Sequence, residues 1–294
     1  MGIVYGVLTA ISWGSSDFIA RFATKRAGAL RCMLYMQGFG FVLLTCLLLL
    51  FHQWGHLFDG SGRQPWIWGL LAGVVNTVAS LSLFKAFEIG KLSVVAPLSA
   101  SAPALTVVLS YFSGEKLTFI RIAGIIAILL GVLLVAGGEK SSSTDDLESQ
   151  QRSGKGLGWA LCSAVTFGIL FWILGLHAVP QTGSFATVWL IRFMGTIITL
   201  AILLLWRLPV RLPAGEGIGA LRWQMVGMGV LDTSAYVLNN RGLQVEQVSV
   251  VTVLASLYGA VTVALAALFL RETVARLQWC GIVSIFAGIF LISR

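Results

Sequence analysis

Long apolar runs alternate with short polar or charged segments along the whole chain. A membrane-spanning helix needs about 20 mostly apolar residues, because each residue adds about 1.5 Å and the hydrocarbon layer is about 30 Å thick. Runs of this length, bounded by charges, glycine or proline, predict ten spans at residues 3–20, 30–51, 65–87, 92–112, 120–136, 157–179, 184–206, 223–243, 248–270 and 277–292. We therefore expect an all-α polytopic membrane protein with ten transmembrane helices.

One polar stretch interrupts this pattern near the middle of the chain. Residues 139–156 are rich in serine, glutamine and acidic residues, and no other polar stretch is as long. Such a composition is typical of a linker between two structured parts. The chain is therefore predicted to consist of two five-helix halves, residues 1–138 and 157–294, joined by this linker.

The two halves also match each other in sequence, which indicates an internal repeat. Shifts of 154 to 157 residues align Trp13 with Phe167, Gln37 with Arg192, Gly40 with Gly195, Asn76 with Asp232, Gly124 with Gly281 and Gly131 with Gly288. Because each half has an odd number of spans, the second half enters the membrane in the opposite sense to the first. Inverted repeats of this kind are typical of carriers that work by alternating access around a site near the membrane midplane.

The composition excludes several other classes of protein. Of the 294 residues, 57% are hydrophobic and 11% are charged, against about 45–50% and about 25% in soluble domains, so neither a soluble nor a disordered chain fits. The net charge of +8 comes from basic residues scattered between the spans, which argues against nucleic-acid binding. All four cysteines lie in apolar runs, so we expect no disulfide scaffold.

Asp232 is the first candidate for a functional site, because ionisable groups at membrane depth are costly and usually functional. It lies about 14 Å into the eighth span, near the midplane, and shares a helix face with Tyr236 and Asn239. Its repeat mate Asn76 shares a face with Ser80. One interpretation is a cavity wall on which Asp232 binds an amino group or a proton. The alternative is an interhelical hydrogen bond or ion pair that holds the bundle together.

Arg192 in the seventh span is the second candidate, at a depth of about 12–14 Å, and its repeat mate is Gln37. Its planar guanidinium group is suited to a substrate carboxylate, so that Arg192 and Asp232 together would receive both ends of an amino acid. The alternative is that Arg192 neutralises Asp232 or binds backbone carbonyls.

Aromatic and small residues in neighbouring spans extend this candidate cavity. Trp13 and Phe167 lie at similar depths and are candidates for an aromatic wall, although aromatic residues in apolar helices more often serve packing. Ser256 lies on a face of small residues in the ninth span, which either leaves room for substrate or lets helices approach closely. Three positions in the fourth and ninth spans are candidate kinks or hinges: Pro97, Pro103 and Gly259.

Two further patterns have weaker functional interpretations. Asp17 lies four residues before Arg21, which favours an ion pair at the membrane interface, with a gating role as the alternative. His52 and His56 are also four residues apart, but no carboxylate or cysteine completes a ligand set, so we expect no metal. The sequence has no phosphate loop, zinc-protease signature or nucleophile elbow, and we expect no cofactor.

Several short motifs resemble those of the drug/metabolite transporter superfamily, in particular its EamA family. They are Trp13-Gly14-Ser15-Ser16-Asp17 in the first span, Gly114-Glu115-Lys116-Leu117-Thr118 before the fifth, and Arg271-Glu272-Thr273-Val274 as the second copy of that signature. Among the ten-helix members, the chain is most similar to amino-acid exporters, including the YddG type for aromatic amino acids.

The resemblance implies a secondary transporter of the plasma (inner) membrane that exports small metabolites, above all amino acids. It implies that the fifth and tenth spans pack outside the cavity, so that four glycines serve helix packing: Gly124, Gly131, Gly281 and Gly288. A carrier for drugs, nucleosides or sugars is the alternative, and a membrane-embedded enzyme using Asp17 and Asp232 is a more distant one. The expected partners are a small-molecule substrate and membrane lipid.

Overall fold

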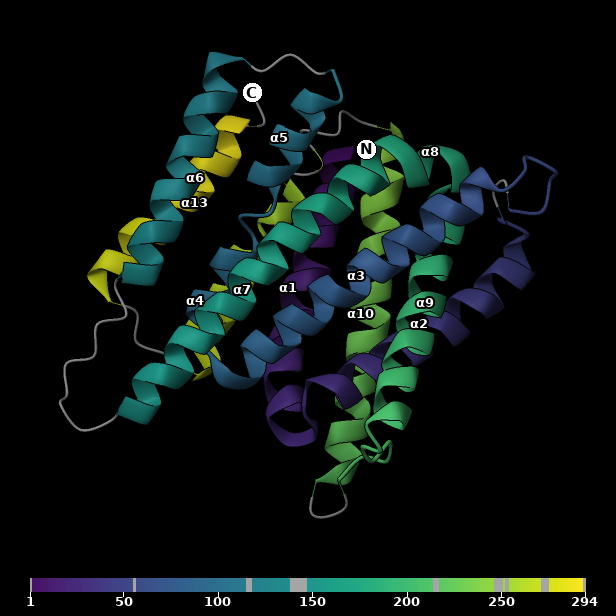
Figure 1. Cartoon of the computed structure of the whole chain (residues 1–294), viewed down its shortest axis with the longest axis horizontal. Helices are drawn as coiled ribbons and strands as arrows, with labels where there is room; N and C mark the ends of the chain where they lie inside the picture. The colour runs from purple at the N-terminus through teal and green to yellow at the C-terminus, as the bar shows by residue number, and fades with distance from the viewer. Residues whose placement is uncertain are drawn as a thin grey trace.

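The computed structural model describes residues 2–54, 57–114, 118–137, 147–213, 217–245, 251, 254–270 and 275–292, whose regular elements are helices (Figure 1). The first half contains α1 (Gly2–Ala27), α2 (Ala29–Phe51), α3 (Gln64–Ile89), α4 (Leu92–Ser99), α5 (Pro103–Phe112) and α6 (Phe119–Gly137). The second contains α7 (Leu147–Ile173), the π-helical turn η1 (Leu174–Ala178), α8 (Val179–Thr182), α9 (Ser184–Leu205), α10 (Ile218–Val245), α12 (Tyr258–Leu265), the π-helical turn η2 (Ala266–Leu270) and α13 (Arg276–Ile292).

These helices fall on all ten predicted spans, which confirms the all-α fold class. Among the described residues, five helical stretches are long and apolar enough to cross a membrane: Ala29–Phe51, Gln64–Ile89, Leu92–Leu109, Gly156–Thr182 and Ser184–Leu205. Shorter apolar helices cover the fifth, ninth and tenth spans. The most polar spans, α1 and α10, pack against each other, and this contact keeps part of their polar surface away from lipid.

Helix α7 extends into the segment that the sequence predicts as a linker. It begins at Leu147. The residues there include leucine, glutamate, glutamine and arginine, which are good helix formers, so the helix continues beyond the apolar part of the span.

The long helices pack chiefly on the other half of the chain. The main pairs are α1 with α10, α3 with α7, α2 with α9, α4 with α12 and α6 with α13. Under the repeat, α1 corresponds to α7 and α3 to α10, so the first two pairs are equivalent, and the other three join a helix to its own mate. The start of α1 and the end of α13 lie at the same end of the bundle (Figure 1). This is the packing expected of two inverted halves.

The fourth span is broken where the prolines predict a kink. Helix α4 contains Pro97 and ends at Ser99, and α5 begins at Pro103. Side-chain hydroxyls bind carbonyls at the break: Ser99 Oγ donates to the Ala96 carbonyl at 3.0 Å, and Ser101 Oγ to the Leu98 carbonyl at 2.7 Å. A broken helix is tolerated inside a membrane protein when such groups replace the lost backbone bonds.

The ninth span is also interrupted, although it has no proline. Its helix has a turn at Leu257, directly before α12. A Cβ atom on Gly259 would lie 2.9 Å from Ala100 Cβ and 3.2 Å from the Ala96 carbonyl oxygen. The interruptions of the fourth and ninth spans therefore touch each other, and Gly259 allows the close approach.

Helices α6 and α13 form a pair at one edge of the molecule (Figure 1). A Cβ on Gly131 would lie 2.6 Å from the Gly281 carbonyl oxygen, and a Cβ on Gly288 would lie 2.6 Å from the Gly124 carbonyl oxygen. Four glycines at repeat-related positions thus bring two backbones into direct contact, as small residues do in membrane helix pairs.

We expect Gly131→Ala to destabilise the protein by about 1–3 kcal/mol, because the added methyl group meets backbone rather than a movable side chain. Gly158→Ala is the matched control, since nothing lies within 4 Å of a Cβ at that helical position. Alanine there should be neutral or stabilising by up to about 1 kcal/mol. Thermal unfolding of both variants in detergent is the measurement, and equal melting temperatures would contradict the role of Gly131.

Candidate functional site

The polar centre of the bundle is a set of hydrogen bonds that joins the two halves. Arg192 on α9 donates from Nη1 to Gln37 Oε1 on α2 and from Nη2 to Asp232 Oδ2 on α10, each at 2.6 Å. Arg192 and Gln37 are fully buried, whereas the Asp232 side chain is 15% exposed. Because Asp232 is partly exposed and Arg192 lies behind it, this ion pair can hold the helices together and also contact a ligand.

Two repeat-related glycines make room for these long side chains. A Cβ on Gly195 would lie 2.6 Å from Gln37 Nε2, and a Cβ on Gly40 would lie 3.0 Å from Arg192 Cδ. Each side chain therefore crosses the facing helix at a glycine. The arrangement is reciprocal, because the repeat aligns Gln37 with Arg192 and Gly40 with Gly195.

A second cross-link lies beside the ion pair. The Tyr236 hydroxyl on α10 donates to Asn76 Oδ1 on α3 at 2.6 Å. The guanidinium carbon of Arg192 lies 5.2 Å from the centre of the Tyr236 ring, which is a cation–π distance. Tyr236 thus stabilises the charge of Arg192 while its ring also faces a cavity.

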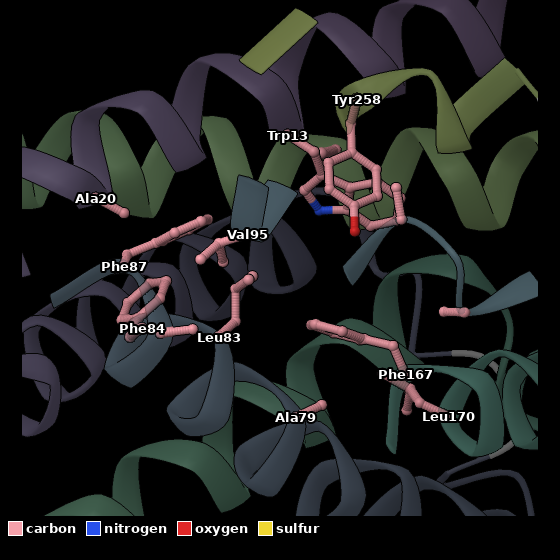
Figure 2. Close-up of a cluster of buried hydrophobic side chains, with 14 of the residues drawn as sticks. Trp13, Ala20, Ala79, Leu83, Phe84, Phe87, Val95, Phe167, Leu170 and Tyr258 are labelled. Atoms are coloured by element: carbon pink, nitrogen blue, oxygen red, sulfur yellow. The ribbon is translucent and has the colours of Figure 1, made fainter. Parts of the chain in front are cut away.

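Two small cavities adjoin this network, and Trp13, Phe171 and Tyr258 line both of them. The Trp13 ring lies 5.0 Å from that of Tyr236 and 6.0 Å from that of Tyr258. Figure 2 shows Trp13 and Tyr258 together, with Phe167 reaching toward them from α7. The cavities have volumes of about 20 and 30 Å³, so each has room for only one or two waters in this conformation.

The residues predicted for the cavity fall into two layers. Those that line a cavity are Trp13, Ser80, Phe167, Asp232, Tyr236, Asn239 and Ser256. Those in the second layer, which line neither cavity, are Gln37, Asn76 and Arg192. The second layer fixes the orientation of the first, because Arg192 holds Asp232 and Asn76 holds Tyr236.

The cavity residues that sequence reasoning missed include Asp17, Phe171 and Tyr258. Asp17 was expected at the interface with Arg21, but it lines the cavity with Asp232, and Arg21 Nη1 donates to the Phe87 carbonyl. The i,i+4 spacing to Trp13 was the available signal, since it places Asp17 on the face predicted for the cavity wall. Phe171 had the same signal, because it lies four residues after Phe167, whereas Tyr258 had none.

The predicted kink in the fourth span, the Glu signature segments and the absence of a metal site remain to be compared with the structure. Pro103 and Ala100 line the first cavity, which places the break of the fourth span at the site. The Glu signature segments, 115–117 and 271–274, and His56 lie outside the described residues. Within the part of the chain that the structure describes, no group of three or more His, Cys, Asp or Glu side chains could hold a metal ion.

Two inverted helical halves that enclose a polar site define a membrane carrier. The sequence profile of the EamA-like transporter family matches residues 1–137 and 154–294. The chain therefore belongs to the EamA-like transporter family and is a multi-pass membrane protein that transports small solutes.

Individual relatives agree with this assignment. An uncharacterised transporter of Bacillus subtilis is 24% identical over 295 residues, which cover 98% of this chain and 88% of that protein. An uncharacterised protein of Methanocaldococcus jannaschii is 30% identical over 135 residues, 46% of this chain but 95% of its own length. A crystal structure with 15% identity superposes with a TM-score of 0.65 over 99% of this chain and 95% of its own, which supports the fold alone.

We expect Arg192→Met to destabilise the protein by about 3–5 kcal/mol, because it leaves the Asp232 carboxylate buried without its partner. The double variant Arg192→Met/Asp232→Leu should recover much of this loss, since it removes both charges. Melting temperatures of the single and double variants test the coupling. If the double variant is no more stable than Arg192→Met, the charge of Asp232 is not what makes the single variant unstable.

Proposed function

We propose that the carrier exports amino acids, aromatic ones in particular, across the plasma membrane by alternating access. The observation that carries this proposal is one cavity, built from both halves, that has a carboxylate beside an aromatic wall, with a guanidinium group directly behind the carboxylate. An aromatic amino acid offers the matching set: an ammonium group, a carboxylate and a flat apolar ring.

The Arg192–Asp232 pair is the proposed binding group for the amino-acid backbone. In the empty carrier the two charges satisfy each other at 2.6 Å. When a zwitterion enters between them, its ammonium group binds Asp232 and its carboxylate binds Arg192. One ion pair within the protein is thus replaced by two ion pairs with the substrate. A solute with only a carboxylate would leave Asp232 buried and unpaired, and that cost selects against it.

The aromatic wall is the proposed binding surface for the side chain. Trp13, Phe167, Phe171 and Tyr258 surround the cavity with rings from α1, α7 and α12. Ring pairs of this kind favour aromatic ligands through stacked and edge-to-face contacts. Ser80 supplies a polar atom to this cavity, and Asn239 and Ser256 supply polar atoms to the adjoining one.

The substrate needs more room than the present conformation gives. Binding sites for small organic molecules have volumes of about 300–1,000 Å³, whereas the cavities admit only one or two waters. The interrupted spans are the segments proposed to move, because Pro103 at the start of α5 and Tyr258 at the start of α12 line the first cavity, and the two breaks meet where Ala100, between α4 and α5, lies against Gly259. Pro97, Pro103 and Gly259 are the proposed hinges.

Counterflow in proteoliposomes tests the proposed substrate. Liposomes are loaded with unlabelled L-phenylalanine, and uptake of labelled L-phenylalanine, 3-phenylpropionate and a sugar is followed. We expect saturable exchange of L-phenylalanine only, because 3-phenylpropionate has the ring and carboxylate but no amino group. Exchange of the sugar without the amino acid would replace this proposal with a sugar carrier.

We expect Arg192→Gln and Asp232→Asn each to weaken L-phenylalanine binding about tenfold or more, since each removes one charge-assisted interaction. Arg241→Gln is the control, because Arg241 lies at the end of α10, where it donates to Gln53 Oε1 at 2.7 Å. Direct binding to the purified variants is measured. Unchanged affinity in both cavity variants would reject the zwitterion site.

A further inference from the structure

A second carboxylate in the cavity has no use in the proposed binding of a zwitterion. Asp17 lies on α1, about 15 Å from the helix end at Ala27. Its side chain is among the buried polar groups, with the residue only 7% exposed, and it lines the cavity that Asp232 also lines. Its Oδ2 atom is buried and has no hydrogen-bond partner within the described residues.

The two carboxylates of this cavity differ in their partners. Asp232 is neutralised by Arg192, which is in turn held by Gln37. Asp17 forms no ion pair within the described part of the chain, and Arg21, one turn further along α1, donates from Nη1 to the Phe87 carbonyl. The cavity therefore contains one balanced pair and one additional carboxylate.

The two tyrosine hydroxyl groups of this cavity donate to acceptors other than Asp17. The titratable groups that share its cavity are Asp232 and Tyr236 from α10 and Tyr258 from α12. Tyr236 donates to Asn76 Oδ1 at 2.6 Å, and Tyr258 donates to Ser99 Oγ at 3.2 Å.

Among the residues that the structure describes, the remaining helices packed against α1 place no cation in the cavity of Asp17. Helix α4 has no titratable side chain, α2 contributes Met36, and α3 contributes Ser80, Leu83 and Phe84. Lys85 of α3 is paired with Glu88 at 3.1 Å and does not line this cavity.

We propose that Asp17 is a cation site at which a proton and an organic ammonium ion exchange, so that the carrier also transports aromatic amines against protons. An unpaired carboxylate in the membrane interior is costly, so in the empty carrier Asp17 holds a proton. When an amine with a single positive charge enters, the proton leaves to water on the open side and the carboxylate binds the ammonium group. This extends the proposed function to a second substrate class.

The charge balance favours this exchange. With Asp17 protonated and Asp232 paired to Arg192, the cavity carries no net charge. Replacing the proton by a monovalent amine keeps it neutral, whereas an amine bound beside a protonated Asp17 would leave one uncompensated positive charge. The aromatic rings of Trp13 and Tyr258, which line the same cavity, suit an amine with an aromatic body.

The experiment compares phenethylamine and L-phenylalanine in the same proteoliposomes. We expect an acid interior to drive phenethylamine uptake in the wild-type protein, with alkalinisation of the interior. Protein-free liposomes under the same gradient give the passive uptake of the amine, which is subtracted. Asp17→Asn should reduce the amine uptake about tenfold or more, because it removes a charge-assisted interaction, while L-phenylalanine counterflow is retained.

Two other variants make the result specific. The double variant Arg192→Gln/Asp232→Asn should have the reverse effect, with loss of L-phenylalanine counterflow and retention of proton-driven amine uptake, because removing both charges keeps the cavity neutral. Asp59→Asn is the control for the same substitution outside the cavity, since Asp59 lies in the loop between α2 and α3.

Each failure identifies which proposal is wrong. Amine uptake by Asp17→Asn at the wild-type rate overturns the cation site, as does wild-type protein that exchanges L-phenylalanine but no amine. Loss of both activities in Asp17→Asn, with an unchanged melting temperature, overturns it too, because Asp17 then belongs to the amino-acid site. Absence of L-phenylalanine exchange with intact amine exchange rejects the amino-acid substrate and leaves the cation site standing.

Discussion

The buried ion pair between Arg192 and Asp232 is the constraint on which the centre of this carrier depends. A guanidinium group without exposure needs a charged partner and further acceptors, and it finds them on two helices, α2 and α10. To meet them, Arg192 has to cross α2 where Gly40 leaves room, and Gln37 has to cross α9 at Gly195. The spacing of α2, α9 and α10 is therefore fixed by polar groups rather than by apolar packing alone.

Most of the fold was predictable because its determinants are local in the sequence. Runs of about 20 apolar residues specify spans wherever lipid surrounds the chain. The alignment of the halves pairs Gln37 with Arg192, and the structure brings these two side chains into contact. The start of α7 was not predictable from hydropathy, because the residues that extend it are polar helix formers.

The site was only partly predictable, because helix periodicity shows which residues share a face but not what that face meets. Asp232, Tyr236 and Asn239 share a face and all line a cavity. The spacing of Asp17 and Arg21 predicts an ion pair at the membrane interface, and yet Asp17 lies in the cavity. The packing of α1 on α10, which the sequence does not show, determines its surroundings. No proline in the ninth span predicts the interruption at Leu257, which lies next to the contact of Gly259 with α4.

The ion pair of Arg192 and Asp232 has no net charge, which limits how strongly a membrane potential can act on this carrier. A membrane potential acts on each net charge with about 2.3 kcal/mol per 100 mV. Arg192 and Asp232 lie 2.6 Å apart and cancel, so as long as they move together the voltage does almost no work on them. The polar layer between the two halves can thus change its orientation without the membrane potential holding it on one side.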